Sequence, residues 1–449
     1  MPKRPVILLH GYSAEAKTMH PWRQLLIDHG YDASEIRLGQ YISLSNEITI
    51  KDVAEAFDRA LRAQGGLSDD EDFDVIVHST GGLVIREWLT TYEARRARVK
   101  HIIGLAPAMF GSPLAHQGRS FLGAVFKGHK DVLSPDFMEA GTQVLSGLEL
   151  GSSYTWKLAE RDLLGNEPTY GTGADTPWPF VFIGSRSYGG LRSLFTNPDG
   201  SDGTVRWSAA GLNTRKFLVD LRCTPGDDEP DRLRSAPWSN VDAPLVFVDR
   251  CNHGTIVSDP PDTLVKMVLE ALEVDDFDAY RGWAGRHADS AGDMKQWQQF
   301  VVRLADERGD PVKDYYLDVG TLDGGEFKVL DHFAMDVHPY TDDPSYRCFH
   351  VNLSELQPGS HTTLALRLIA DSGTELIAYR GTTKALAPDA ASGGVDKWTA
   401  QIDLTPVLRD ADVRFFHPYT TTLVDIAVNR EPMPASGVSH LLSFAGLDA

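Results

Sequence analysis

The sequence lacks any apolar run close to the roughly 20 residues that a helix needs to cross a bilayer. The basic start Met-Pro-Lys-Arg-Pro is followed by an apolar stretch, but this stretch covers only residues 6–9 and is far too short for the core of a signal peptide. We therefore expect a cytoplasmic protein without a transmembrane segment. A mature form that has lost its leader, or export without a signal peptide, stays open as an alternative.

Cysteine is scarce, and positive charge is in deficit. Cys223, Cys251 and Cys348 stand too far apart for a metal motif or a disulfide framework, which favours three free thiols in a reducing compartment. Lys plus Arg is 43 and Asp plus Glu is 63, so the formal net charge is −20. Such a surface repels phosphate backbones and anionic membranes, so we expect no nucleic-acid partner.

The remaining composition is that of an ordinary globular protein, and 449 residues suffice for two or three domains. In residues 1–283, short apolar runs alternate with helical patterns, which predicts a mostly parallel sheet covered by helices. The expected strands are residues 6–9, 73–77, 101–106, 180–184, 217–221 and 245–248, and the expected helices are residues 22–29, 50–64, 82–98 and 263–272.

Two stretches depart from this alternation. Residues 111–176 are too long for a loop, so we expect a helical lid or cap above the sheet. Residues 284–296 are polar and are typical of a linker, and residues 297–449 predict an all-β sandwich because short alternating runs recur between turns. The expected strands of the sandwich are residues 300–304, 315–319, 348–353, 363–369, 376–379, 398–404 and 422–428.

A serine stands where an apolar strand meets a glycine-rich helix start, in His78-Ser79-Thr80-Gly81-Gly82. A serine on such a sharp strand-to-helix turn presents its hydroxyl above the sheet, next to the helix N-terminus. The simpler interpretation is a helix N-cap. A nucleophilic serine needs a base and a carboxylate from elsewhere in the chain.

Three further loops follow predicted strands. They are His10-Gly11-Tyr12, the loop that contains Asp202-Gly203-Thr204-Val205, and Asn252-His253-Gly254. Reactive groups gather at the carboxyl ends of strands in an open parallel sheet. A backbone N–H after the first strand can help to hold an oxyanion, together with the N–H of Thr80. We expect a serine, an acid and a histidine to meet at this edge.

The acid has three candidates. The Asp-Gly-Thr-Val pattern favours Asp202, while Asp199 lies in a similar turn and Asp249 lies four residues before His253. The carboxylates that do not serve as the acid are then turn formers. Calcium bound near Asp199 and Asp202 is a further alternative. We expect His10 and His78 to be structural or to line the pocket.

Together these motifs resemble the α/β-hydrolase fold and, within it, the bacterial lipases and esterases. The resemblance covers residues 5 to about 275 and includes Gly111-Ser112-Pro113-Leu114-Ala115. It implies that Ser79 is the nucleophile, His253 the base and Asp202 the orienting acid. The backbones of Tyr12 and Thr80 would form the oxyanion hole, and residues 111–176 would be the lid and acyl-binding cap. The usual Gly-x-Ser-x-Gly motif begins here with Val77.

The resemblance implies a lipase or esterase that hydrolyses carboxylic esters, with acyl lipids or small-molecule esters as substrates and transient contact with a lipid interface. It implies no metal and no organic cofactor. An acyltransferase that uses the same three residues is one alternative. A catalytically silent binding protein that acts through the β-sandwich, which loosely resembles the accessory domain of some lipases, is another. Nothing in the sequence predicts an oligomeric state.

Overall fold

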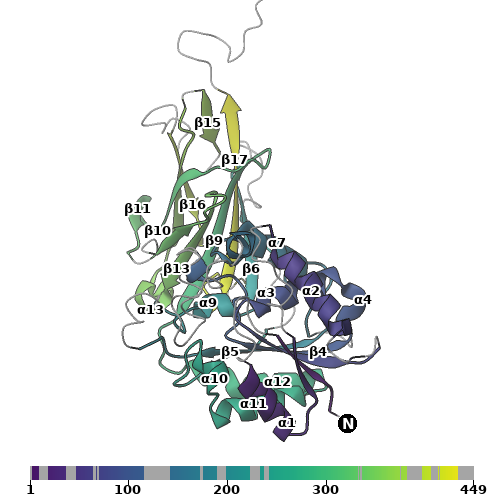
Figure 1. Cartoon of the computed structure of the whole chain (residues 1–449). Helices are drawn as coiled ribbons and strands as arrows, with labels where there is room; N and C mark the ends of the chain where they lie inside the picture. Colours follow the sequence, from purple (N-terminus) through teal and green to yellow (C-terminus); the bar gives the residue numbers. More distant parts are fainter. Residues whose placement is uncertain are drawn as a thin grey trace, which may run out of the picture. The chain divides into compact units, whose positions relative to one another are not determined.

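The computed structural model describes most of the chain (Figure 1). The described residues are 3–9, 19–36, 47–63, 67, 70–115, 142–171, 175–189, 199–222, 233–236, 242–331, 333, 336–374, 376–381, 397–405, 413 and 415–432. No helix among them is long and apolar enough to span a bilayer. The chain divides into one unit of residues 1–214, 237–297 and 418–421 and a second of residues 215–236, 298–417 and 422–449.

The first unit contains a six-stranded parallel sheet with the order β2-β1-β3-β4-β5-β8. Its inner strands are apolar on both faces, as helices on both sides of a parallel sheet require. Their carboxyl ends all lie at one edge, which positions the loops that follow them. The strands are β1 (Val6–Leu9), β2 (Ala33–Ile36), β3 (Phe73–His78), β4 (Val99–Leu105), β5 (Trp178–Gly184) and β8 (Leu245–Val248).

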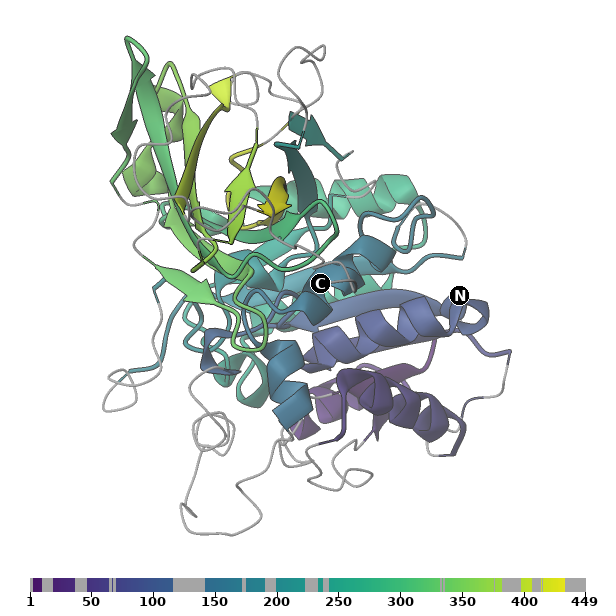
Figure 2. The ribbon, with the colours of Figure 1, turned by 90° about the horizontal axis from the view of Figure 1, so that it is seen from above.

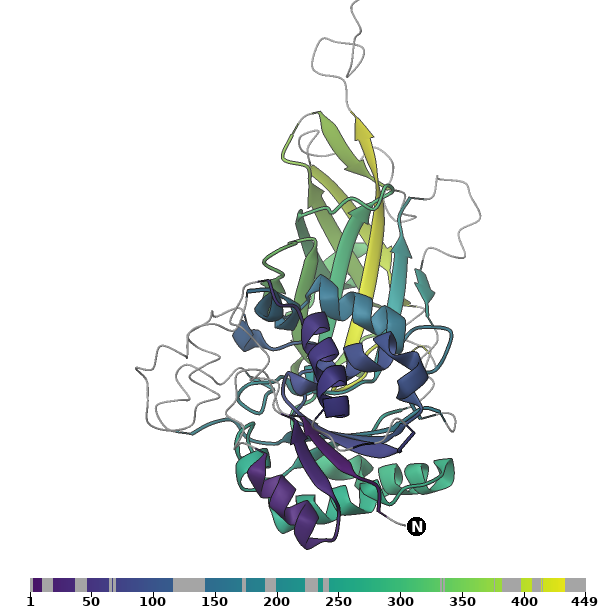
Figure 3. The same cartoon turned by 45° about the vertical axis from the view of Figure 1, so that its right-hand side comes forward.

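Helices cover both faces of this sheet (Figures 1 and 3). One face carries α1 (His20–Asp28), α10 (Thr255–Ser258), α11 (Asp262–Leu272) and α12 (Phe277–His287). The other carries α2 (Ile50–Ala63), α3 (Gly81–Thr91) and α4 (Glu93–Arg96), with α2 and α3 side by side (Figure 2). The short elements α6 (Thr142–Leu148) and α7 (Ser153–Asp162) pack on α2 and α3. The remaining turns are η2 (Pro113–Ala115), α9 (Trp207–Ala210) and η5 (Ala288–Ala291).

The core between the parallel sheet and α12 is aromatic. Phe180 of β5 packs edge-on against Trp283 of α12, with ring centroids 4.7 Å apart, and Tyr280 lies 5.2 Å from the same phenyl ring. All three side chains are buried. Large aromatic side chains contribute much of the free energy of a core because each buries a large apolar area.

The second unit is a β-sandwich. One sheet has the order β11-β10-β14-β16, and the other has the order β12-β13-β9-β17-β6-β7 with β15 paired to β17. The strands are β6 (Thr214–Asp220), β7 (Leu233–Ser235), β9 (Trp297–Asp306), β10 (Asp314–Asp323), β11 (Glu326–Val329), β12 (Val337–Pro339), β13 (Tyr346–Asn352), β14 (Ala365–Asp371), β15 (Ile377–Arg380), β16 (Lys397–Asp403) and β17 (Thr421–Pro432). The helical turns α13 (Leu353–Leu356) and η6 (Pro358–Ser360) follow β13.

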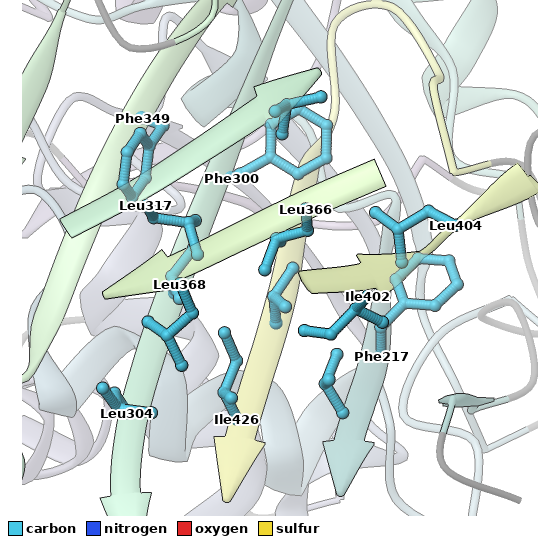
Figure 4. Close-up of a cluster of buried hydrophobic side chains, with 14 of the residues drawn as sticks. Phe217, Phe300, Leu304, Leu317, Phe349, Leu366, Leu368, Ile402, Leu404 and Ile426 are labelled. Carbon is cyan, nitrogen blue, oxygen red and sulfur yellow. The ribbon is translucent and has the colours of Figure 1, made fainter. Parts of the chain in front are cut away.

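Side chains of both sheets gather in one core (Figure 4). Leu317 of β10 and Leu368 of β14 are direct cross-strand neighbours in the first sheet, while Phe300 and Ile426 come from the second sheet. Each of these side chains is buried. Alternate residues of each strand therefore fill the space between the sheets, as the period of two in a strand dictates.

One expected strand belongs to the other architecture. Residues 217–221 were expected in the parallel sheet, but β6 pairs in the sandwich sheet, and that expectation was wrong. Phe217 and Val219 are buried while the intervening Leu218 is half-buried, which is the pattern of a strand with one face on a core. The expected linker at residues 284–296 contains the end of α12 and η5, where the hydroxyl of Ser290 accepts a hydrogen bond from the N–H of Phe247 in β8.

Replacing Leu368 by alanine should destabilise the sandwich, because a buried leucine side chain leaves a cavity when it is truncated. The expected loss is about 2–5 kcal/mol. The matched control is Leu376→Ala at a side chain that is 44% exposed, where the expected change is within about 0.5 kcal/mol. Chemical denaturation followed by circular dichroism measures both variants, and equal losses would contradict the assigned core.

Candidate active site

Ser79 lies in a strained turn between β3 and α3. Its φ is +55°, a left-handed conformation that is uncommon for a residue with a Cβ atom and that persists only where the surroundings impose it. The carbonyl oxygen of Ser79 accepts hydrogen bonds from the N–H of Gly82 at 3.0 Å and of Ala108 at 2.9 Å. The N-cap residue of α3 is Thr80, so Ser79 is not the helix cap that the simpler interpretation would make it. The geometry is that of a nucleophile elbow.

Gly82 permits the close approach that this turn needs. A Cβ atom at this position would lie 2.9 Å from the Cβ of Pro107 and 3.0 Å from the sulfur of Met109. Real Cβ atoms essentially never come that close, so the start of α3 can pack on residues 107–109 only with glycine here.

Asp202 is fully buried and accepts three hydrogen bonds. Its Oδ1 accepts from the backbone N–H groups of Thr204 at 3.0 Å and Val205 at 2.8 Å, and its Oδ2 accepts from Nδ1 of His253 at 2.9 Å. Hydrogen bonds to an ionised acceptor are about twice as strong as those between neutral groups. The turn of residues 202–205 therefore folds around the carboxylate of Asp202. Oδ1 bonds to the backbone of the turn, and Oδ2 accepts the hydrogen bond from His253.

His253 is held at two points to the loop of residues 199–206 around Asp202, which we name the acid loop after its predicted role. Besides the side-chain bond, its backbone N–H donates to the carbonyl of Asp202 at 3.0 Å. Asn252 fixes the turn because its Oδ1 accepts from the N–H groups of Gly254 and Thr255, both at 3.0 Å. Since a carboxylate only accepts, Nδ1 of His253 carries a proton, and in the neutral ring the lone pair lies on Nε2.

His78 brings the turn of Ser79 beside this pair. Its Nε2 lies 3.0 Å from the backbone carbonyl of His253, to which it donates, and the two imidazole rings are 4.6 Å apart between centroids. His78 is the last residue of β3 and precedes Ser79 directly. The contact joins the carboxyl end of β3 to the loop that follows β8.

The other candidate acids lie in different surroundings. The side chain of Asp249 is 77% exposed and pairs with Arg250, and Asp199 is exposed. Within the described residues, no group of three or more His, Cys, Asp and Glu side chains is arranged to hold a metal ion.

Other predicted site residues are only partly covered by the structure. Thr80 is buried at the N-terminus of α3. Tyr12 and His10 lie outside the described residues, as do residues 116–141 of the expected lid. The rest of the expected lid includes α6 and α7.

Two residues that contact the acid loop were not found from the sequence. The hydroxyl of Ser112 donates to the carbonyl of Thr204 at 2.7 Å, and the ring of Tyr188 packs so closely on Gly203 that a Cβ there would lie 2.5 Å from it. The sequence places Ser112 in the Gly111–Ala115 motif but indicates no role for it. Tyr188 lies in a stretch without periodicity, so no local signal marked it.

Comparison with known proteins identifies the fold. The model of the alpha/beta hydrolase family matches residues 6–267. The chain belongs to this family. Phospholipase PlaB from Legionella pneumophila is 21% identical, with 97% of each chain covered and a TM-score of 0.75, and its complex with thio-NAD gives the same values. Lipase BlEst2 from Bacillus licheniformis, in mature form, is 16% identical, covers 61% of this chain and 93% of its own, and has a TM-score of 0.38.

No curated protein matches the chain. The likeness to the Legionella phospholipase extends over both units, so the hydrolase followed by a β-rich region is a fold that the two proteins share. The predicted α/β-hydrolase fold and the β-rich C-terminal region are confirmed.

Replacing Gly203 by alanine should destabilise the acid loop. The φ of Gly203 is +98°, and an added Cβ would meet the ring of Tyr188. We expect a loss of about 1–3 kcal/mol from the backbone strain alone. The control is Gly189→Ala, because a Cβ there meets nothing within 4 Å. Thermal unfolding measures both variants, and a Gly203→Ala variant as stable as the control would refute the packing described.

Proposed function

We propose that this protein is a serine-dependent hydrolase of carboxylic esters in which Ser79, His253 and Asp202 form a catalytic triad. The observation that carries the proposal is the buried hydrogen bond between Asp202 and Nδ1 of His253, beside the strained turn of Ser79. The family membership supports it, because this chain order of serine, acid and histidine is the one used by α/β-hydrolases.

In the proposed mechanism each of these groups has one step. His253 Nε2 takes the proton of the Ser79 hydroxyl as its oxygen attacks the ester carbonyl, and Asp202 stabilises the imidazolium that forms. The N–H groups of Thr80 and Tyr12 hold the oxyanion of the tetrahedral intermediate. Collapse of the intermediate breaks the ester bond, and the alcohol leaves with the proton from His253. Water, deprotonated by the same nitrogen, then attacks the acyl-enzyme and releases the acid with Ser79 restored.

We propose acyl lipids as the substrate class, reached through transient contact with a lipid interface. The shared fold over 97% of both chains makes glycerophospholipids the first class to test, since the neighbour is named a phospholipase. The net charge of −20 favours neutral or zwitterionic interfaces over anionic ones. The expected lid includes residues 116–141. In the sequence they come shortly after residues 106–112, a segment that packs on the turn of Ser79.

Replacing Ser79 by alanine should abolish hydrolysis of a p-nitrophenyl ester and of phosphatidylcholine vesicles. Loss of a triad serine costs about 10⁶-fold in kcat in a well-studied hydrolase. Alanine keeps the Cβ atom, so the strain of the left-handed turn is unchanged and the melting temperature should be nearly the same. Labelling by a fluorophosphonate probe should disappear with the activity. A variant that turns over ester at the parent rate would end the assignment.

Replacing Asp202 by asparagine should lower kcat by about 10⁴-fold, because an amide can donate to Nδ1 of His253 and so stabilise the wrong tautomer. Asp199→Asn and Asp249→Asn serve as matched controls, since both remove a carboxylate from neighbouring loops. We expect each control to keep kcat within about twofold of the parent, as is usual for exposed side chains away from the chemistry. A larger loss in either control than in Asp202→Asn would reassign the acid.

A further inference from the structure

We propose that Arg86 and Asp162 are positioning residues for the nucleophile, and that their buried ion pair fixes the segment that packs on the turn of Ser79. The inference rests on the proposed function for its kinetic readout. We call residues 106–112, which follow β4, the bracing segment. Neither Arg86 nor Asp162 touches the reacting groups, so both act through this segment.

The ion pair is bidentate and almost completely excluded from solvent. Nε of Arg86 donates to Oδ2 of Asp162 at 2.7 Å, and Nη2 donates to Oδ1 at 2.8 Å, while the two side chains are 1% and 0% exposed. The hydroxyl of Tyr170 donates to the same Oδ2 at 2.8 Å. Burial alone would lower the pKa of Arg86, but the Asp162 carboxylate outweighs it and the pKa is raised, so the guanidinium stays charged.

The guanidinium has a third connection, to the bracing segment. Its Nη1 donates to the carbonyl oxygen of Met109, and its carbon lies 5.1 Å from the ring centroid of Phe110. An arginine side chain presents its donors in one rigid plane, so the two bonds to Asp162 also fix the direction of the bond to Met109. The ion pair thereby determines where the bracing segment lies.

The bracing segment touches both halves of the site. The N–H of Ala108 donates to the carbonyl of Ser79 at 2.9 Å, and Ser112 donates to the carbonyl of Thr204 in the acid loop at 2.7 Å. The segment itself is strained, since Ala106 has a φ of +48°. The hydrogen bond from Ala108 to Ser79 therefore links two segments that each contain a residue in the left-handed conformation, Ser79 and Ala106. Such strain persists only where the surrounding structure imposes it.

Stability alone does not account for this pair. A fully buried ion pair pays a large desolvation cost, and a well-packed apolar pair of similar volume is often as stable or more stable. A second ion pair, between Glu87 of α3 and Arg161 of α7, already joins the same two helices, with Nη2 to Oε2 at 2.6 Å. What an apolar pair could not supply is the directed hydrogen bond to Met109.

The decisive experiment is the double variant Arg86→Met/Asp162→Leu in the full chain, which removes both charges and roughly keeps the volume. We expect a melting temperature close to that of the parent. We also expect kcat on a short p-nitrophenyl ester and the rate of fluorophosphonate labelling to fall about 10- to 100-fold, the scale of a misplacement near 1 Å. KM should change little, because the pair touches no substrate. A folded double variant with parent kcat and labelling rate would overturn the inference.

The matched control is Glu87→Gln/Arg161→Gln, which removes the neighbouring pair between the same helices without changing any contact to the bracing segment. We expect its kcat to stay within about twofold of the parent. Equal losses of kcat in the control and the test variant would show that helix docking alone matters, and would also overturn the inference.

Arg86→Lys covers the case in which the double variant fails to fold. Lysine keeps the charge opposite Asp162 but lacks the planar fork that reaches Met109. A folded Arg86→Lys with lower kcat and unchanged KM supports the inference, and one with parent kcat refutes it.

A readout independent of catalysis separates this inference from the proposed function. Loss of the pair should speed backbone amide hydrogen exchange in residues 106–112 and 79–84. If the parent protein is not labelled at Ser79 and hydrolyses no ester, the proposed function fails. Faster exchange in these residues in the double variant would then still support positioning, whereas unchanged exchange would refute it.

Discussion

The site depends on one hydrogen bond between two buried side chains, from Nδ1 of His253 to Oδ2 of Asp202. Neither group could be buried alone at low cost, because an unpaired carboxylate loses its hydration and an unpaired imidazole donor loses its partner. The main chain removes this difficulty. The carboxylate receives two further backbone N–H groups, and the two loops are joined again by the N–H of His253 and the carbonyl of Asp202. The pair is therefore fixed in orientation before any substrate arrives.

The parallel sheet decides which loops can take part. Strands β3, β5 and β8 run in the same direction, so the segments that follow them begin at one edge although they are far apart in the sequence. His78 joins two of these segments directly, because its ring donates a hydrogen bond to the carbonyl of His253 in the loop after β8. The bracing segment, after β4, does the same between the β3 turn and the acid loop. The four neighbouring strands β3, β4, β5 and β8 are thus each followed by one segment of the same network.

The sequence predicted the features whose chemistry is local. Asp202 bonds to residues two and three positions ahead of it, and Asn252 does the same for the histidine turn, so both left short motifs. The six strands of the parallel sheet were predicted except for β2, whose residues Ala-Ser-Glu-Ile carry little apolar signal. The placement of β6 failed because strand character is local while the choice of sheet is not. The Arg86–Asp162 pair spans 76 positions and leaves no pattern that a single sequence can reveal.

A histidine hydrogen-bonded to an aspartate does not by itself make a reactive site, and the molecule contains its own comparison. His101 lies 2.7 Å from Asp74 through Nδ1, and both side chains are as buried as the pair at 253 and 202. The other nitrogen of His101 is 2.6 Å from the carbonyl of Val274, and Arg4 binds the same carboxylate. This cluster lies near the amino ends of β3 and β4, where it ties the sheet to Val274, two residues after the end of α11. The two pairs differ in the edge of the sheet at which they lie. Of the two, the pair of His253 and Asp202 is at the carboxyl ends of the strands, beside the strained turn of Ser79. Its buried hydrogen bond therefore orients the imidazole of His253 in addition to holding two loops together.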